Sequence, residues 1–181
     1  MKRIKTWLAV LGLLAAFLIV APASANAAPY CGITWGSLAK GGGTLSPAPI
    51  TNVRAGRNSC FDRLVVDIKG PRAGYRVSYV SAVRGIGSGK VIPLRGAADL
   101  QIAVLNPAYY SNGKASYTPA NPNELINTAG YSTFRQVAYA GSFENHTVIG
   151  LGVRSRLPFR VFTLSGPGNL TRLVIDVAHR W

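Results

Sequence analysis

The stretch "CFDRLVVDIKG", from Cys60 to Gly70, places an acid inside an apolar run that has the pattern of a β-strand. Near the other end of the chain, "LTRLVIDVAH", from Leu170 to His179, repeats this pattern. Successive side chains of a strand point to opposite faces, so the apolar residues of each run share one face. Asp67 and Asp176 lie on the opposite, more polar face. Each run therefore predicts a β-strand with one buried face.

The two runs also predict how they pair. Four residues along a strand span about 13 Å, so Arg63 does not readily reach Asp67 in its own strand. If the runs are antiparallel neighbours, one register places Arg63 opposite Asp176 and Asp67 opposite Arg172. Cross-strand charge pairs of this kind contribute about 0.2 to 1 kcal/mol each. We therefore favour structural charge pairs over a catalytic role for the two acids.

Alternating apolar and polar residues recur along most of the chain. Turn signals such as Gly166-Pro167-Gly168 separate the segments. This spacing is typical of a sandwich or barrel, and we predict an all-β fold, an antiparallel β-sandwich of about eight strands. The predicted strands are 50–54, 63–69, 75–80, 100–105, 135–143, 147–153, 159–164 and 172–178.

The longest segment without strand pattern is 106–133, and it contains the one predicted helix. We expect Asn121 to cap this helix, Pro122 to occupy its first position and Gly130 to end it. The same loop carries Tyr109, Tyr110 and Tyr117. Such rings either stack on sugars in a binding loop or close the end of the sandwich, and the sequence leaves both alternatives open.

Two further strands have unusual faces. In "HTVIGLGV", from His146 to Val153, Gly150 and Gly152 leave one face bare, which permits close approach of another strand or a ligand. In "RLPFRVFTL", from Arg156 to Leu164, both faces carry bulky side chains, which predicts a central strand.

The first 27 residues predict export. Three cations precede an apolar stretch from Trp7 to Ala21, and small residues that include Ala25-Asn26-Ala27 follow it. This is typical of a signal peptide, and the apolar stretch is shorter than the roughly 20 residues that span a bilayer. We expect a signal peptide over 1–27, a Gly/Pro-rich arm over 28–49 and a β-sandwich domain over 50–181, with no transmembrane segment after cleavage.

The two cysteines, Cys31 and Cys60, both lie after the predicted cleavage site. An even count in an oxidising compartment favours one disulfide, which would tie the arm to the start of the first strong strand. The alternative is a lipid attached to Cys31, and the preceding Pro29-Tyr30 argues against it.

The chain carries a formal net charge of +14. Three of these positive charges, on Lys2, Arg3 and Lys5, belong to the predicted signal peptide and would be removed with it. Outside a cell, the remaining basic surface favours anionic polymers or wall glycans, and we expect no nucleic-acid partner. The loop tyrosines and four arginines are the predicted ligand-binding residues. The set is Tyr109, Tyr110, Tyr117, Arg135, Arg154, Arg156 and Arg160.

Enzymatic patterns fit less well. The chain has two histidines, too few for a usual catalytic zinc site, and we expect neither a metal nor a cofactor. Glu144 and His146 form the one local cluster suited to acid/base chemistry. A small secreted hydrolase that uses this pair, or Asp67 with Asp176, is the alternative function. A partner protein that docks through an exposed sheet edge is a third.

Several blocks of the sequence resemble a known family. They include "ITNVRAGRNSCFDRLVVDIKG" (50–70), "RLPFRVFTLSGPG" (156–168) and "RLVIDVAHRW" (172–181). From about Ile50 to the end, the chain resembles the AMIN-like domain of secreted actinobacterial proteins. Related AMIN domains are non-catalytic β-sandwiches that accompany cell-wall amidases. The resemblance implies a secreted module associated with the cell envelope, with peptidoglycan or an anionic wall polymer as its ligand.

Overall fold

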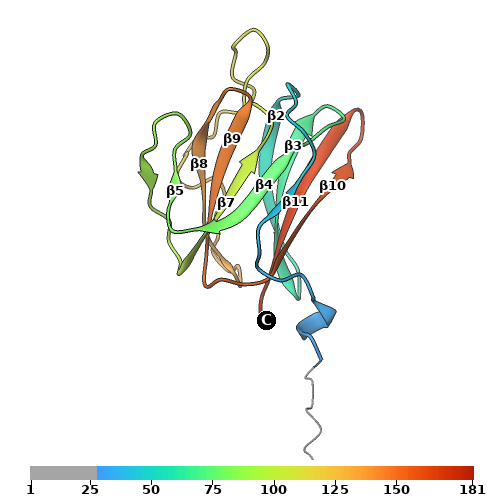
Figure 1. Ribbon diagram of the computed structural model, residues 1–181, viewed down its shortest axis with the longest axis vertical. Helices are drawn as coiled ribbons and strands as arrows, with labels where there is room; N and C mark the ends of the chain where they lie inside the picture. Colours follow the sequence, from blue (N-terminus) through green and yellow to red (C-terminus); the bar gives the residue numbers. More distant parts are fainter. Residues whose placement is uncertain (1–27) are drawn as a thin grey trace, which may run out of the picture.

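The computed structural model describes residues 28–181, which form two antiparallel sheets lying face to face (Figure 1). The predicted signal peptide, 1–27, lies outside the described residues. Sheet A has the order β1 (Lys40–Gly42), β4 (Tyr75–Val80), β7 (Ala98–Val104), β9 (His146–Val153) and β8 (Phe134–Phe143). Sheet B has the order β10 (Phe159–Ser165), β11 (Leu170–Ala178), β3 (Phe61–Lys69) and β2 (Ile50–Arg57). A small hairpin pairs β5 (Val83–Arg84) with β6 (Val91–Ile92).

All eight predicted strands are present, so the predicted β-sandwich is confirmed. Alternate residues of each long strand enter one core between the sheets, as the sequence alternation requires. Leu64, Val66 and Ile68 of β3 are fully buried there. The additional strands β1, β5 and β6 have two or three residues each, which is too short for an alternation to be recognised.

The predicted register of β3 and β11 is confirmed. These strands are antiparallel neighbours at the centre of sheet B, with Arg63 opposite Asp176 and Asp67 opposite Arg172. Because one face of each strand is buried, a slip by one residue would turn the apolar residues out of the core. The burial pattern therefore fixes which residues share the polar face, and the observed register sets which of their charges face each other.

The predicted helix between Asn121 and Gly130 is wrong. The described residues contain no α-helix, and their only helical turn is the 3₁₀ segment η1 (Tyr30–Gly32). Asn121 does accept the amide of Asn123, as a capping residue would. The segment then pairs with β8, because Leu125 N–H donates to the carbonyl of Val137 and Tyr139 N–H donates to that of Pro122. Backbone bonds to the sheet edge replace those of a helix.

The predicted central position of the strand at residues 159–164 is also wrong, because β10 is an edge strand of sheet B. Its two faces are nevertheless both covered. Phe159 enters the core, while Arg160 and Phe162 belong to a cluster on the outer face. The N-terminal arm lies along the open edge, where Phe159 N–H donates to the carbonyl of Gly36.

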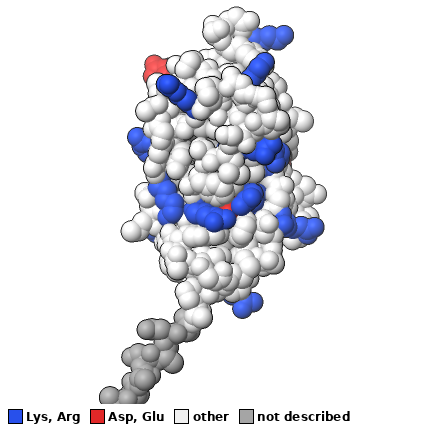
Figure 2. All heavy atoms as spheres, turned by 90° about the vertical axis from the view of Figure 1, so that its right-hand side faces the viewer, with Lys and Arg blue, Asp and Glu red and all other residues white. Residues whose placement is uncertain are grey.

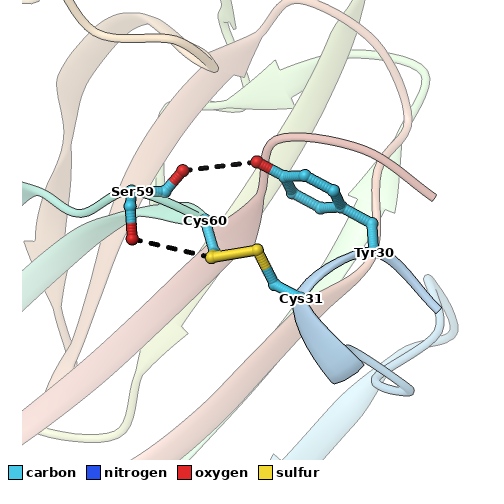
Figure 3. Close-up of a disulfide and its surroundings, with 4 residues drawn as sticks. All are labelled: Tyr30, Cys31, Ser59 and Cys60. Atoms are coloured by element: carbon cyan, nitrogen blue, oxygen red, sulfur yellow. Dashed lines mark hydrogen bonds between the residues drawn. A yellow bond between two sulfur atoms is a disulfide. The ribbon is translucent and has the colours of Figure 1, made fainter. Parts of the chain in front are cut away.

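The arm crosses from sheet B to sheet A on this side of the sandwich. A disulfide joins Cys31 to Cys60, immediately before β3, so the predicted bridge is confirmed (Figure 3). Further along, β1 pairs with β4 and extends sheet A by one strand. The arm therefore spans the gap between β10 and β4. On the opposite side, the loop 106–133 packs Tyr117, Leu125 and Ile126 against the core.

The outer face of sheet A is covered by the segment between β4 and β7. Val83, Ile86 and Leu94 pack on Ala140 and Val148 of that face. A Cβ atom at Gly150 would lie 3.0 Å from Leu94, and one at Gly152 would collide with the carbonyl of Arg95. The bare glycines predicted to allow close approach thus receive this segment of the same chain.

No helix in residues 28–181 combines the length and the apolar character that a membrane crossing requires.

Candidate functional site

The outer face of sheet B lacks a covering segment like that of sheet A, and it presents arginines and aromatic rings to solvent. Figure 2, viewed from the side on which β10 lies in Figure 1, shows a band of Lys and Arg side chains with little acidic surface between them. The strand pairing sets the order of the side chains. One row across the sheet is Arg160, Asp176, Arg63 and Gly56, and the next is Phe162, Val174, Val65 and Arg54.

Asp176 is the centre of the first row. Its side chain is fully buried and accepts bonds from two arginines. Arg63 is bidentate, with Nε 2.6 Å from Oδ1 and Nη2 2.8 Å from Oδ2, while Arg160 places Nε 2.8 Å from Oδ2. The hydrogen bond from Arg63 to Asp176 raises the pKa of this arginine above its ordinary value. The bonds to Asp176 fix both guanidinium groups in orientation.

Three aromatic rings surround these guanidinium groups. Arg160 lies over Trp35 at 4.4 Å and over Phe162 at 5.0 Å, measured to the ring centroids. Arg63 lies over Phe61 at 5.2 Å, and Trp35 meets Phe61 edge to face. We name Trp35, Phe61, Arg63, Arg160, Phe162 and Asp176 the arginine cluster. Cation–π contacts of this kind stabilise a guanidinium by about 0.5 to 2 kcal/mol.

The arginine cluster retains capacity to bind a ligand. Two cations meet one anion, so the cluster has a net positive charge. Within the described residues, the Nη1 atom of Arg63 and both Nη atoms of Arg160 make no hydrogen bond. The side chains of Arg63 and Arg160 are 29% and 40% exposed. Oriented donors beside flat rings suit a ligand that has both anionic groups and apolar ring faces.

Asp67 forms a separate pair on the same face. We predicted Arg172 as its partner, and this is wrong, because Arg54 of β2 holds Asp67 with Nε 2.9 Å from Oδ2 and Nη2 3.0 Å from Oδ1. Asn52 donates to the same carboxylate. Arg172 does stand opposite Asp67, yet Arg54 occupies both oxygens from the other neighbouring strand.

The predicted tyrosines lie at two other places. Tyr117 is half-buried against the core and makes an edge contact with Tyr139. Burial and the neighbouring Tyr139 raise the pKa of Tyr117 above its ordinary value. Tyr109 accepts the amide of Asn145, and with Tyr110 it lines a small hollow beyond the ends of β8 and β9. Tyr117 thus closes the side of the sandwich, while ligand binding by Tyr109 and Tyr110 stays a prediction.

The predicted arginines are likewise dispersed. Arg160 belongs to the arginine cluster, and Arg156 lies over Tyr79 and binds Ser37 of the arm. Arg135 and Arg154 line a hollow at the end of the sandwich that carries the disulfide. The structure therefore does not gather the predicted ligand-binding residues into one site.

Glu144 and His146 have no catalytic arrangement. Glu144 and Asn145 both adopt positive φ and form the two-residue turn between β8 and β9. The Nδ1 atom of His146 lies 2.7 Å from the backbone carbonyl of Glu144 rather than bonding to its carboxylate. The turn accounts for both residues.

Asp67 and Asp176 also lack the geometry of a glycosidase pair. Asp67 lies opposite Arg172 and Asp176 opposite Arg63, so the two acids are separated by four residues along the sheet, or about 13 Å. Acid pairs that cleave glycosides lie about 5 to 9.5 Å apart. Both carboxylates are also held by arginines. The structure thus gives no support to the hydrolase alternative that was based on these residues.

The three aromatic residues of the arginine cluster were not predicted from the sequence. Phe162 carries a usable signal, because it alternates with Val161 and so shares a face with Arg160. Phe61 relates to Arg63 in the same way. Trp35 carries no such signal, because it lies in the arm and reaches the sheet only through the fold of the whole chain.

This combination defines a class of protein. It is an antiparallel β-sandwich with one outer face covered by its own chain and the other open and charged. The chain belongs to the AMIN-like domain family, whose family model matches residues 48–179, and the resemblance inferred from the sequence is confirmed. No curated protein and no solved structure matches the chain. Family membership indicates a binding module associated with the cell envelope and with cell-wall amidases.

Proposed function

We propose that this protein is a secreted, non-catalytic module that binds the cell wall, with peptidoglycan or an anionic wall polymer as its ligand. The arginine cluster is the binding surface. The observation that carries this proposal is the pair Arg63 and Arg160, held by the buried Asp176 with unoccupied donors toward solvent. Family membership supports the envelope as the location.

The chemistry of the surface favours a wall glycan with acidic groups. Guanidinium groups attract carboxylate or phosphate groups and bond to them with a fixed fork of donors. The rings of Trp35 and Phe162 beside them provide apolar surface for the faces of sugar rings. A repeating polymer places several such units along one face, which strengthens weak individual contacts.

Sedimentation with purified cell-wall sacculi tests this proposal. We expect the protein to pellet with the sacculi at low salt and to be partly released at high salt, because exposed charges are screened. The variant Arg160→Gln with Phe162→Ala should weaken retention by at least about tenfold, since it removes a charged donor and a ring.

The matched control is Arg76→Gln with Leu38→Ala, which removes one arginine and one exposed apolar side chain outside the arginine cluster. Its retention should stay within about twofold of the original protein, since it keeps the proposed surface. Equal retention of the two double variants would exclude the arginine cluster as the binding surface. Release of soluble fragments from the sacculi by the protein would contradict a non-catalytic role.

A further inference from the structure

A second basic site lies at the end of the sandwich that carries the disulfide. A hollow of about 580 Å³ is lined there by Tyr30, Arg135, Arg154, His179 and Arg180, with two serines at its rim. The residues come from five separate parts of the chain. These are the arm, the turn between β2 and β3, the start of β8 with the loop before it, the residue after β9 and the segment after β11. The hollow is thus formed by the fold rather than by one loop.

The three arginines are held in place by uncharged groups. Arg135 donates to the carbonyls of Tyr131 and Phe134, and Arg154 donates to the carbonyl of His179. Arg180 lies 5.2 Å from the ring centroid of Tyr30. These contacts orient the guanidinium groups without neutralising them, so the walls of the hollow stay positively charged.

The acidic residues of the chain compensate this charge only in part, because one acid lies close to three arginines. The sequence has six Asp and Glu residues, and all lie in the described part. Asp62 is the acid beneath the hollow, with a side chain 1% exposed that accepts the amides of Thr133 and Phe134 and contacts His179. The other acids lie elsewhere. Asp67, Asp176 and Glu124 are paired with arginines outside the hollow, Asp99 lies on sheet A and Glu144 lies in the turn between β8 and β9.

We propose that this hollow binds a phosphate group, as a free anion or as part of a phosphorylated molecule. One bidentate arginine is sufficient to engage both oxygens of a carboxylate, as Arg63 and Asp176 demonstrate in this protein. Three guanidinium groups around one hollow supply more donors than a carboxylate accepts, and they match the oxygens and higher charge of a phosphate. The site is separate from the arginine cluster and goes beyond the proposed function.

The disulfide positions one wall of the site. Figure 3 shows Tyr30 next to Cys31, with its hydroxyl donating to the carbonyl of Ser59, next to Cys60. Arg180 in turn lies over the ring of Tyr30. Phosphate binding should therefore depend on the bridge, because its loss frees the tyrosine that holds one of the three cations.

Titration of the ¹⁵N-labelled protein with inorganic phosphate at constant ionic strength tests the site. We expect the amide resonances of Ser59, Ser132 and His179 to shift and to saturate together. Arg180→Gln should weaken this binding by at least about tenfold, because it removes one charged donor. Arg180 is exposed and makes no hydrogen bond within the described residues, so this variant should keep the fold.

Arg76→Gln is the matched control, since it removes the same charge from strand β4 of sheet A, and it should change the affinity by less than about twofold. Equal effects of the two substitutions, or the absence of shifts at the three amides, would overturn the proposal. Titration with acetate is a second test. If acetate binds as tightly as phosphate, the proposal that the hollow is a phosphate site is refuted. Because Arg180→Gln leaves the arginine cluster intact, failure here is distinguishable from failure of sacculus binding.

Discussion

The outer faces of the two sheets differ in what covers them. On sheet A, small side chains and Gly150 and Gly152 admit the segment between β4 and β7, which packs directly on the sheet. On sheet B, the apolar Val65 and Val174 are 5% and 1% exposed although no such segment covers them. Their neighbours on the adjacent strands are Phe162 and Arg54, whose long side chains shield them instead.

This difference shows how residue size decides the use of a face. Where a strand has no side chains on one face, the backbone of another segment can pack directly against it, and that face becomes part of the interior. A strand with arginines keeps backbone away, covers apolar surface with the methylene groups and leaves the charged ends in water. The first face serves stability, and the second stays available for a ligand.

The largest expected effect comes from adding a side chain to the covered outer face of sheet A. Gly152→Val would place a side chain where the carbonyl of Arg95 lies, so the covering segment must move. We expect a loss of at least about 3 kcal/mol in the free energy of unfolding, measured by urea denaturation. The control is Gly56→Ala on the outer face of sheet B, where an added Cβ meets no atom within 4 Å. Similar losses in both variants would contradict the comparison.

A second test removes the bridge that anchors the arm beside the open face. Replacing Cys31 and Cys60 by serine should lower the free energy of unfolding by about 3 kcal/mol, since the bridge closes a long loop of the unfolded chain. Trp35 should also leave the arginine cluster, which tryptophan fluorescence quenching would reveal as increased solvent access. Unchanged quenching would mean that the remaining contacts of the arm are sufficient to place Trp35.

A third test compares the two acids on the open face. Asp176→Asn removes the buried charge that holds two arginines, and we expect a loss of about 2 kcal/mol in unfolding free energy. Asp67→Asn affects a pair whose arginine side chain is 47% exposed, so the loss should stay below about 1 kcal/mol. Thermal or urea unfolding measures both. A larger loss for Asp67→Asn would reverse the assigned importance of the two pairs.

The smallest expected effect concerns the tyrosines at the side of the sandwich. This side belongs to neither outer face and so serves as a reference for both. Burial raises the pKa of Tyr117 and of Tyr139 above the ordinary value of 10.0. A raised pKa in the folded state means that these groups contribute stability below pH 10.0 and lose it as pH rises through the folded value. We expect tyrosinate absorbance to show a late phase that accompanies alkaline unfolding. Titration of all tyrosines at 10.0 without unfolding would contradict this.

The fold was predictable because burial imposes a period of two on every long strand. The same alternation in Arg63 to Lys69 and Arg172 to Ala178, together with the opposite charges on their polar faces, was sufficient to predict their register. The helix at Asn121 to Gly130 failed because local capping signals do not reveal that a neighbouring strand edge offers its backbone groups. The edge position of β10 was not predicted. Bulky residues on both faces of a strand are expected in a central strand, but they also occur where one face carries a cluster of side chains.

The candidate site was predictable only in part. Arg160 was chosen for its charge, and Arg63 and Asp176 were chosen as a structural pair. Their union with Trp35 depends on a contact between the arm and β10, which no local pattern encodes. The period of two places Phe162 beside Arg160, but it does not say which face stays uncovered.

The bridge between Cys31 and Cys60 also turns residues 31–60 into a closed covalent ring that includes the exposed Leu38 and Leu45. A protease that cuts once within this ring opens it without releasing a fragment, so the nicked molecule keeps its full mass until a reductant is added. In the secreted protein that we propose, where thiols are scarce, the bridge would allow a cleavage to be tolerated that would remove the arm of an unbridged chain.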